Sequence, residues 1–228
     1  MVGLMKAYWS IPGPSKAPRG EHCICFYKFD GSNLRFGWSK KRGWTKFGTR
    51  RRMFDEKDPE YGPAIELFFN KHAEGLERVF RDNKNYRGIE TAIAFFEYYG
   101  PSSFGCYHDF TERFQLSLLD VNILRRGLVL PKDFVRDFGT LEGAAHVIYE
   151  GPFTDQLIED VKENRFGLRE GVVAKGVKGN SVHDLWMVKI KTKWWMNELR
   201  RRANALDQKD FAQYQRLLDE NKREQDDV

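Results

Sequence analysis

Short apolar and aromatic runs, divided by polar turn residues, dominate the chain between residues 21 and 46. Asp30-Gly31 separates the first run from the second, and Lys41-Arg42-Gly43 separates the second from the third. This pattern is typical of antiparallel strands joined by tight turns. The proline-containing segment before residue 21 is predicted to be an irregular arm.

Later in the chain, the spacing of apolar residues alternates between helical and strand-like patterns. Residues 63–80 begin with Pro63 and carry apolar side chains at helical spacing, which predicts one amphipathic helix. A second helix is predicted at 154–164, and the segment after Lys191 has a wholly helical pattern. Further strands are predicted at 91–98, 114–121, 144–149, 170–175 and 185–191. We therefore expect an α+β domain built on antiparallel strands over residues 1–192, followed by a helical tail over residues 193–228.

Composition and charge indicate what kind of partner the protein could bind. The chain has 228 residues, of which 41% are hydrophobic, so one large domain with a sizeable core can form. Its formal net charge is +5. The segment 31–54 holds eight Lys or Arg residues and no Asp or Glu, interleaved with five aromatic residues. Such a segment can follow a phosphate backbone, although a solvated hairpin whose aromatic side chains face the core fits the pattern equally well.

Several classes of protein are disfavoured. The three cysteines do not form a CxxC motif, so neither a zinc site nor a disulfide framework is indicated. No apolar stretch approaches the length of a membrane span, and the start of the chain does not resemble a secretory leader. We therefore expect an intracellular, cytoplasmic protein without a membrane partner.

Five charged residues interrupt or adjoin apolar runs. These residues are Lys28, Glu97, Glu170, Lys189 and Lys191. A single charged residue in such a place is most often at a sheet edge and faces water, but five are harder to explain in this way. A buried charge without a partner costs several kcal/mol, so such residues need partners or a ligand. Three lysines and two carboxylates on one concave face would suit a nucleoside triphosphate with a divalent cation.

The order and spacing of these residues resemble the covalent nucleotidyltransferases, which include polynucleotide ligases and mRNA-capping guanylyltransferases. The superfamily has a Lys-x-Asp-Gly motif, a Glu in a strand, an apolar strand ending in Asp, a Glu-Gly-apolar-apolar-x-Lys motif and a final Lys-x-Lys. The matching segments here are Lys28-Phe29-Asp30-Gly31, Phe96-Glu97-Tyr98-Tyr99-Gly100, Leu118-Leu119-Asp120-Val121, Glu170-Gly171-Val172-Val173-Ala174-Lys175 and Lys189-Ile190-Lys191.

Within this superfamily the chain looks most like the bacteriophage-type RNA ligases. Asn33 extends the first motif to Lys-x-Asp-Gly-x-Asn, as in that branch, and the residues after Lys191 are too few for an oligonucleotide-binding barrel. The resemblance implies an ATP-grasp-like ligase adenylation domain, and a phage- or virus-encoded protein would fit it. The implied partners are RNA ends, with DNA or RNA–DNA hybrid strands as further options. We expect a monomer rather than a homodimer.

The resemblance also implies roles for individual residues. Lys28 would attack ATP and form a lysyl–AMP intermediate, while Lys189 and Lys191 would hold the α-phosphate. Glu97 would bind the ribose, and Glu97 and Glu170 would bind Mg²⁺ or Mn²⁺. Asp30, Gly31, Arg50, Leu119 and Glu170 would line the nucleotide site, and Asn33, Arg51 and Arg52 would contact nucleic acid. Leu119 stands where the family often has an aromatic residue that stacks on adenine, and Arg42 or Arg51 could take the place given to Arg50.

Other functions share the same pattern. A capping guanylyltransferase would use GTP with the same core, and a DNA ligase would differ in contacts that the sequence does not reveal. A non-catalytic RNA-binding module that retains the fold is the alternative from a different class. ATP-dependent RNA ligation, through an adenylylated 5′ end, remains the main prediction.

Overall fold

The structure is a computed structural model, and it describes residues 5–101, 113–179 and 181–203. The chain forms two compact units. Unit 1 comprises Met1–Trp9 and Phe29–His146, and unit 2 comprises Ser10–Lys28 and Val147–Val228. The chain passes from unit 2 to unit 1 between Lys28 and Phe29, so the Lys-x-Asp-Gly motif spans this junction.

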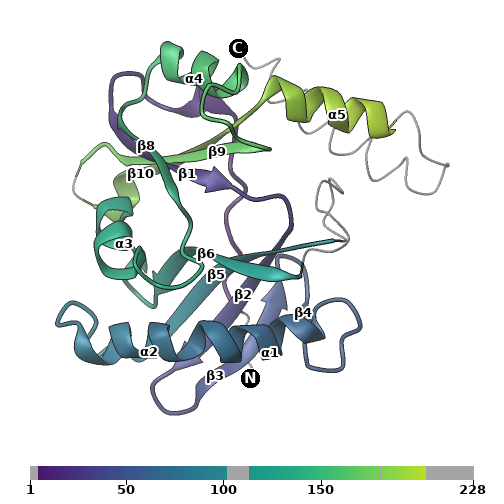
Figure 1. The fold of residues 1–228 in the computed structure, drawn as a ribbon. Helices are drawn as coiled ribbons and strands as arrows, with labels where there is room; N and C mark the ends of the chain where they lie inside the picture. Colours follow the sequence, from purple (N-terminus) through teal and green to yellow (C-terminus); the bar gives the residue numbers. More distant parts are fainter. Residues whose placement is uncertain (1–4, 102–112, 180, 204–228) are drawn as a thin grey trace. The chain divides into compact units, whose positions relative to one another are not determined.

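Unit 1 contains a six-stranded sheet in which every pair of neighbouring strands is antiparallel (Figure 1). The strand order is β4-β3-β2-β5-β6-β7. The strands are β2 (Ser32–Ser39), β3 (Gly43–Thr49), β4 (Met53–Phe54), β5 (Thr91–Tyr99), β6 (Gln115–Ile123) and β7 (Gly127–Leu128). The strands expected at 91–98 and 114–121 are thus confirmed as β5 and β6, whereas the short β4 and β7 were not predicted.

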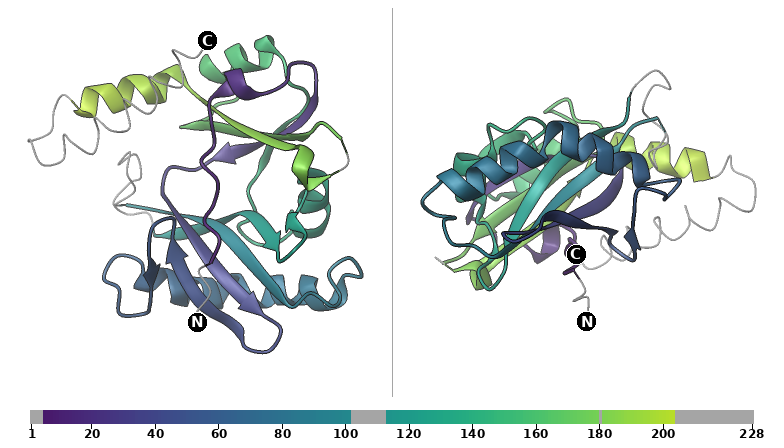
Figure 2. Two further views of the ribbon diagram at one scale, coloured as in Figure 1. Left: turned by 180° about the vertical axis from the view of Figure 1, so that it is seen from behind. Right: turned by 90° about the horizontal axis from the view of Figure 1, so that it is seen from below.

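Helices α1 (Gly62–Lys71) and α2 (Ala73–Asp82) lie along one face of this sheet (Figures 1 and 2). The single helix predicted over 63–80 is wrong, because the chain breaks at His72, where φ is −121°. The buried His72 ring packs 4.9 Å from Phe96, and its Nδ1 lies 3.1 Å from the Glu142 carbonyl oxygen. Packing of this side chain therefore overrides the helical periodicity. A third helix, α3 (Pro131–Phe138), was not predicted.

Aromatic residues form the core between the sheet of unit 1 and its helices. Phe36 of β2 stacks on Phe68 of α1 with 4.1 Å between ring centroids, and Trp44 and Phe96 meet Phe68 edge-on. Phe36, Trp44 and Phe96 are all buried. For Phe36 and Trp44, which belong to the basic segment, the alternative in which the aromatic side chains face the core is therefore correct.

Unit 2 contains a four-stranded antiparallel sheet with the order β10-β9-β1-β8. The strands are β1 (His22–Lys28), β8 (Val147–Pro152), β9 (Gly171–Val177) and β10 (Leu185–Lys191). The helices are α4 (Asp155–Lys162) and α5 (Lys193–Ala203), with short 3-10 turns at Pro14–Lys16 and Val182–Asp184. Thr154 caps α4, as its sequence suggested, because its side chain accepts a hydrogen bond from Leu157 N at 3.1 Å.

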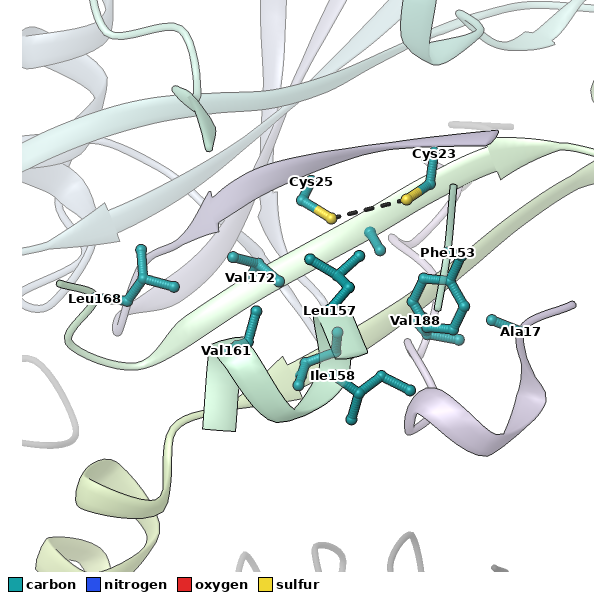
Figure 3. Packing of buried hydrophobic residues seen from close by; sticks show 12 residues of the cluster. Ala17, Cys23, Cys25, Phe153, Leu157, Ile158, Val161, Leu168, Val172 and Val188 are labelled. Carbon is teal, nitrogen blue, oxygen red and sulfur yellow. Dashed lines mark hydrogen bonds between the residues drawn. The ribbon is translucent and has the colours of Figure 1, made fainter. Parts of the chain in front are cut away.

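Alternate residues of β1 face opposite sides of the unit 2 sheet. Cys23 and Cys25 face a buried apolar cluster with α4 (Figure 3). Their Sγ atoms are 3.9 Å apart, and both are free thiols. Ile24, Phe26 and Lys28 occupy the alternate positions, and so they lie on the other face.

The expected α+β class with antiparallel sheets is confirmed. The start of the helical tail at residue 193 coincides with α5, and the rest of the predicted tail, 204–228, lies outside the described residues. The boundary between residues 192 and 193 as a domain limit stays a prediction. Among the helices in the described segments, none has both the length and the apolar character needed to cross a membrane.

Candidate functional site

One face of the unit 2 sheet carries the predicted lysines. Lys28, Gly171 and Lys191 are paired in register across β1, β9 and β10. Because strand side chains alternate with period two, Lys189 lies on the same face as Lys191. The apolar cluster with α4 occupies the opposite face. One face of the sheet therefore carries the lysines, and the other face packs against the apolar cluster.

The Glu170 side chain contacts both Lys28 and Lys191. Its Oε1 atom lies 2.9 Å from Lys28 Nζ and 3.3 Å from Lys191 Nζ. The Glu170 side chain is 5% exposed, and those of Lys28 and Lys191 are 21% and 14% exposed. A side chain on Gly171 is not tolerated here, because its Cβ would lie 1.9 Å from the Ile190 carbonyl oxygen. The structure thus brings together three of the predicted site residues.

Three lysines influence one another in this cluster. Burial lowers the pKa of Lys191 from its ordinary value, and the neighbouring Lys28 and Lys189 lower it further, while Glu170 opposes the shift. Lysine side chains gathered in one place attract anions such as a phosphate. The predicted role of these lysines in phosphate binding stays a prediction.

Lys175 is a further member of this face to which the sequence analysis gave no role. It pairs in register with Ile24 and Met187, which places it on the same side of the sheet as Lys28. Its side chain is buried, and Nζ lies 4.7 Å from the centroid of the Phe26 ring. Lys175 is the last residue of the Glu-Gly motif in the sequence, but only the register with β1 and β10 places it on this face.

The second oxygen of the Glu170 carboxylate is a candidate metal ligand. Its Oε2 atom is buried and accepts no hydrogen bond from the described residues. No group of three or more His, Cys, Asp or Glu side chains able to hold a metal occurs within the described part of the chain. Mg²⁺ is commonly held by one or two carboxylates together with substrate phosphates. The residues therefore fit an ion that is bound together with a nucleotide.

In unit 1, two predicted residues are cross-strand neighbours. Asn33 of β2 is paired in register with Glu97 of β5, so their side chains lie side by side on one face of the six-stranded sheet. The Asn33 Nδ2 donates to the Phe96 carbonyl oxygen at 3.4 Å, and its Oδ1 is buried without a hydrogen-bond partner among the described residues. Asn33 and Glu97 thus form a polar pair inside a largely apolar sheet.

Leu119 occupies an irregular position in β6. Phe95 of β5 pairs with Asp120, while the next residue, Phe96, pairs with Leu118. Leu119 is therefore the extra residue of a β-bulge, which changes the direction of local side chains. The sequence gave no signal for this bulge.

Gly31 lies just after the junction between the units. Close packing against β5 explains why this position is a glycine. A Cβ at this position would lie 2.3 Å from the Tyr98 carbonyl oxygen. Nearby, Phe29 stacks on Tyr99 with 4.7 Å between ring centroids. The glycine is thus required by β5, and the predicted roles of Asp30 and Gly31 in nucleotide binding stay predictions.

The three arginines after β3 have different surroundings. All three are exposed. Arg52 forms ion pairs with Asp58 and Glu60 and lies 5.4 Å from the centroid of the Tyr61 ring. Arg50 donates to the Trp9 carbonyl oxygen at 3.4 Å, and neither Arg50 nor Arg51 has an acidic partner within the described residues. Arg51 is therefore the arginine of this group that is most available to an anion.

Comparison with solved structures identifies the fold class as that of RNA ligases. Structures of an RNA ligase from Naegleria gruberi match this chain with TM-scores of 0.59 to 0.61 at 14% sequence identity. They include a Lys→Ala mutant with ATP and Mn and a Glu→Ala mutant with AMP and Mn. At this identity, the likeness shows only that the chain has a fold similar to that of the Naegleria RNA ligase.

The match covers 83% to 85% of this chain and 57% to 58% of the Naegleria chains. The chain thus spans less than two thirds of the length of these structures. No protein-family profile matches the sequence, and no curated protein matches it.

Proposed function

We propose that the protein is an ATP-dependent RNA ligase that joins 3′-hydroxyl and 5′-phosphate ends through a lysyl–AMP intermediate. The observation that carries this proposal is the contact of Lys28 and Lys191 with one oxygen of the buried Glu170. The motif order in the sequence and the RNA-ligase-like fold support the same assignment.

In the first step, the Lys28 amine attacks the α-phosphorus of ATP. An N–P bond forms, the bond between the α-phosphorus and the bridging oxygen breaks, and pyrophosphate leaves. Lys28 must lose a proton before it attacks, because only the neutral amine is a nucleophile. Lys189 and Lys191 stabilise the negative charge that develops on the α-phosphate.

The two carboxylates have separate tasks in this proposal. Glu170 holds the Lys28 ammonium in place before the reaction and takes part in binding Mg²⁺ or Mn²⁺ through its Oε2 atom. The metal, when bound, neutralises charge on the phosphates. Glu97 accepts hydrogen bonds from the ribose hydroxyls.

In the later steps, AMP passes from Lys28 to the 5′ phosphate of RNA, and the 3′ hydroxyl of a second end then displaces AMP. Asn33 orients the 5′-phosphate end, and Arg51 contacts the RNA backbone. Asn33→Ala should therefore retain adenylylation of the protein and lose sealing of RNA ends. Equal loss of both steps would contradict this role.

The test is transfer of label from α-labelled ATP to the denatured protein, with α-labelled GTP in parallel and with each metal. Wild type should be labelled by ATP, and Lys28→Ala should not be labelled. Lys132→Ala, which removes an exposed lysine from α3, is the matched control and should be labelled like wild type. The protein should first be freed of any bound AMP, so that the lysine is available.

Each other outcome favours a different function. Label from GTP rather than ATP would favour a capping guanylyltransferase. Label that persists in Lys28→Ala would show that another group is the nucleophile. Absence of label from both nucleotides would favour a non-catalytic RNA-binding module. With labelling established, nicked and single-stranded RNA and DNA substrates decide which ends the enzyme joins.

A further inference from the structure

The N-terminal arm of unit 1, residues 5–9, covers the sheet face on which Asn33 lies. Met5 packs over Gly37 of β2, where a Cβ would lie 2.6 Å from its Sδ atom. The carbonyl oxygen of Met5 accepts a hydrogen bond from the buried Arg35 guanidinium. Asn33, Arg35 and Gly37 are alternate residues of β2, so they share this face.

Tyr8 is a buried residue of this arm, and its hydroxyl forms a hydrogen bond with β6. Its side chain is buried, its ring centroid lies 4.9 Å from that of Phe95, and its hydroxyl donates to the Asp120 carboxylate. Burial raises the pKa of Tyr8 well above its ordinary value, and Asp120 and Glu97 raise it further. The hydroxyl therefore stays protonated and donates its hydrogen bond at any pH near neutrality.

The carboxylate that Tyr8 holds belongs to the bulge of β6. Phe95 faces Asp120 in the strand register, and the preceding Leu119 is the additional residue of the bulge. A bulge is a local departure from regular pairing, so its geometry depends on contacts from outside the ladder. Tyr8 supplies such a contact from a segment far away in the sequence.

We infer that Tyr8 is a positioning residue of the nucleotide site, which fixes Asp120 and thereby the bulge that presents Leu119 to the purine base. This inference rests on the proposed function. Tyr8 acts, through Asp120 and Leu119, on the base end of the nucleotide. Loss of its hydroxyl therefore weakens ATP binding and leaves the rate of the chemical step unchanged.

The test compares Tyr8→Phe with a matched substitution elsewhere in unit 1. Tyr86 is also buried, and its hydroxyl donates to Asp137 at 2.8 Å, but it packs against Phe80 and Phe138 in the helical part of the unit. Tyr86→Phe thus removes the same kind of hydrogen bond away from the β6 bulge. Both variants should lower Tm by a similar amount, about 2–4 °C.

Self-adenylylation then separates positioning from stability. Tyr8→Phe should raise the half-saturating ATP concentration about fivefold to tenfold, with the maximal rate unchanged, and Tyr86→Phe should leave both at wild-type values. Inhibition by tripolyphosphate, which has no base, should be the same in wild type and Tyr8→Phe.

The remaining outcomes overturn the inference in distinguishable ways. If wild type is labelled and Tyr8→Phe has wild-type ATP dependence, Tyr8 has only a structural role. A fall in maximal rate, or weaker inhibition by tripolyphosphate, would show that Tyr8 acts on the phosphates or the chemistry. If wild type is not labelled at all, the proposed function fails, and the role of Tyr8 fails with it.

Discussion

Lys28 Nζ lies 2.9 Å from Glu170 Oε1, so the proposed nucleophile forms an ion pair with a nearly buried carboxylate. An ion pair stabilises the ammonium form of a lysine, whereas attack on a phosphate needs the neutral amine. The same carboxylate also contacts Lys191 at 3.3 Å. Glu170 is therefore shared between two lysines of the proposed site.

Glu170→Gln should lower the maximal rate of self-adenylylation. The amide carries no charge, so it neither pairs with the Lys28 ammonium as the carboxylate does nor binds a divalent metal as a carboxylate does. The measurement is the rate of labelling from α-labelled ATP at saturating ATP. Glu163→Gln, which removes the partner of Lys193 on the surface, is the control and should keep the wild-type rate. A wild-type rate in Glu170→Gln would show that this carboxylate has no part in the reaction.

Lys191→Met should make the protein more stable and less active. Burial lowers the pKa of Lys191 in the folded state, so the unfolded chain binds more protons as pH approaches the ordinary value of 10.5 from below. Wild-type stability should therefore rise with pH in that range, and the variant should lack this rise. At pH 8 the variant should gain about 1 kcal/mol in unfolding free energy, measured with denaturant, because Glu170 keeps Lys28 as a partner. A less stable variant would contradict this view.

Arg51 and Arg52 should respond differently to substitution by alanine. Arg51 has no acidic partner among the described residues, so Arg51→Ala should weaken RNA binding and lower the slope of log K against log salt by about one. Arg52 pairs with Asp58 and Glu60, so Arg52→Ala should mainly lower Tm. Binding titrations at several salt concentrations, with thermal melts of both variants, check this division. Similar salt slopes in the two variants would overturn it.

His72 should make the protein sensitive to acid. Burial lowers the pKa of His72 to about 4 in the folded state, against an ordinary value of 6.5. Its contribution to stability is complete above about pH 6.5 and is lost as pH falls towards 4, because the unfolded chain then binds the extra proton. The loss should approach about 3 kcal/mol at pH 4. His72→Gln should flatten this part of the stability profile, and His22→Gln, at a half-exposed site, should not.

Patterns along the chain were sufficient to predict the α+β class, most of the strands and the lysines that share one face of a sheet. Strand alternation alone places Lys189 and Lys191 on one face, since period two is a property of the backbone. The chemistry proposed for Lys28 also came from the sequence, through the order of five short motifs. These features are local or follow from residue order, so they can be read without coordinates.

Other features were decided by contacts between distant segments. The break at His72 depends on Glu142, the bulge at Leu119 depends on the register with β5, and Arg52 is held by Asp58 and Glu60 across a turn. The contact of Tyr8 with Asp120 joins residues 112 positions apart. Local propensity carries no information about such pairings, because they form only when the whole chain packs. The sequence by itself thus determined the strands and the lysine-bearing face, and the tertiary structure decided which side chains hold those residues in place.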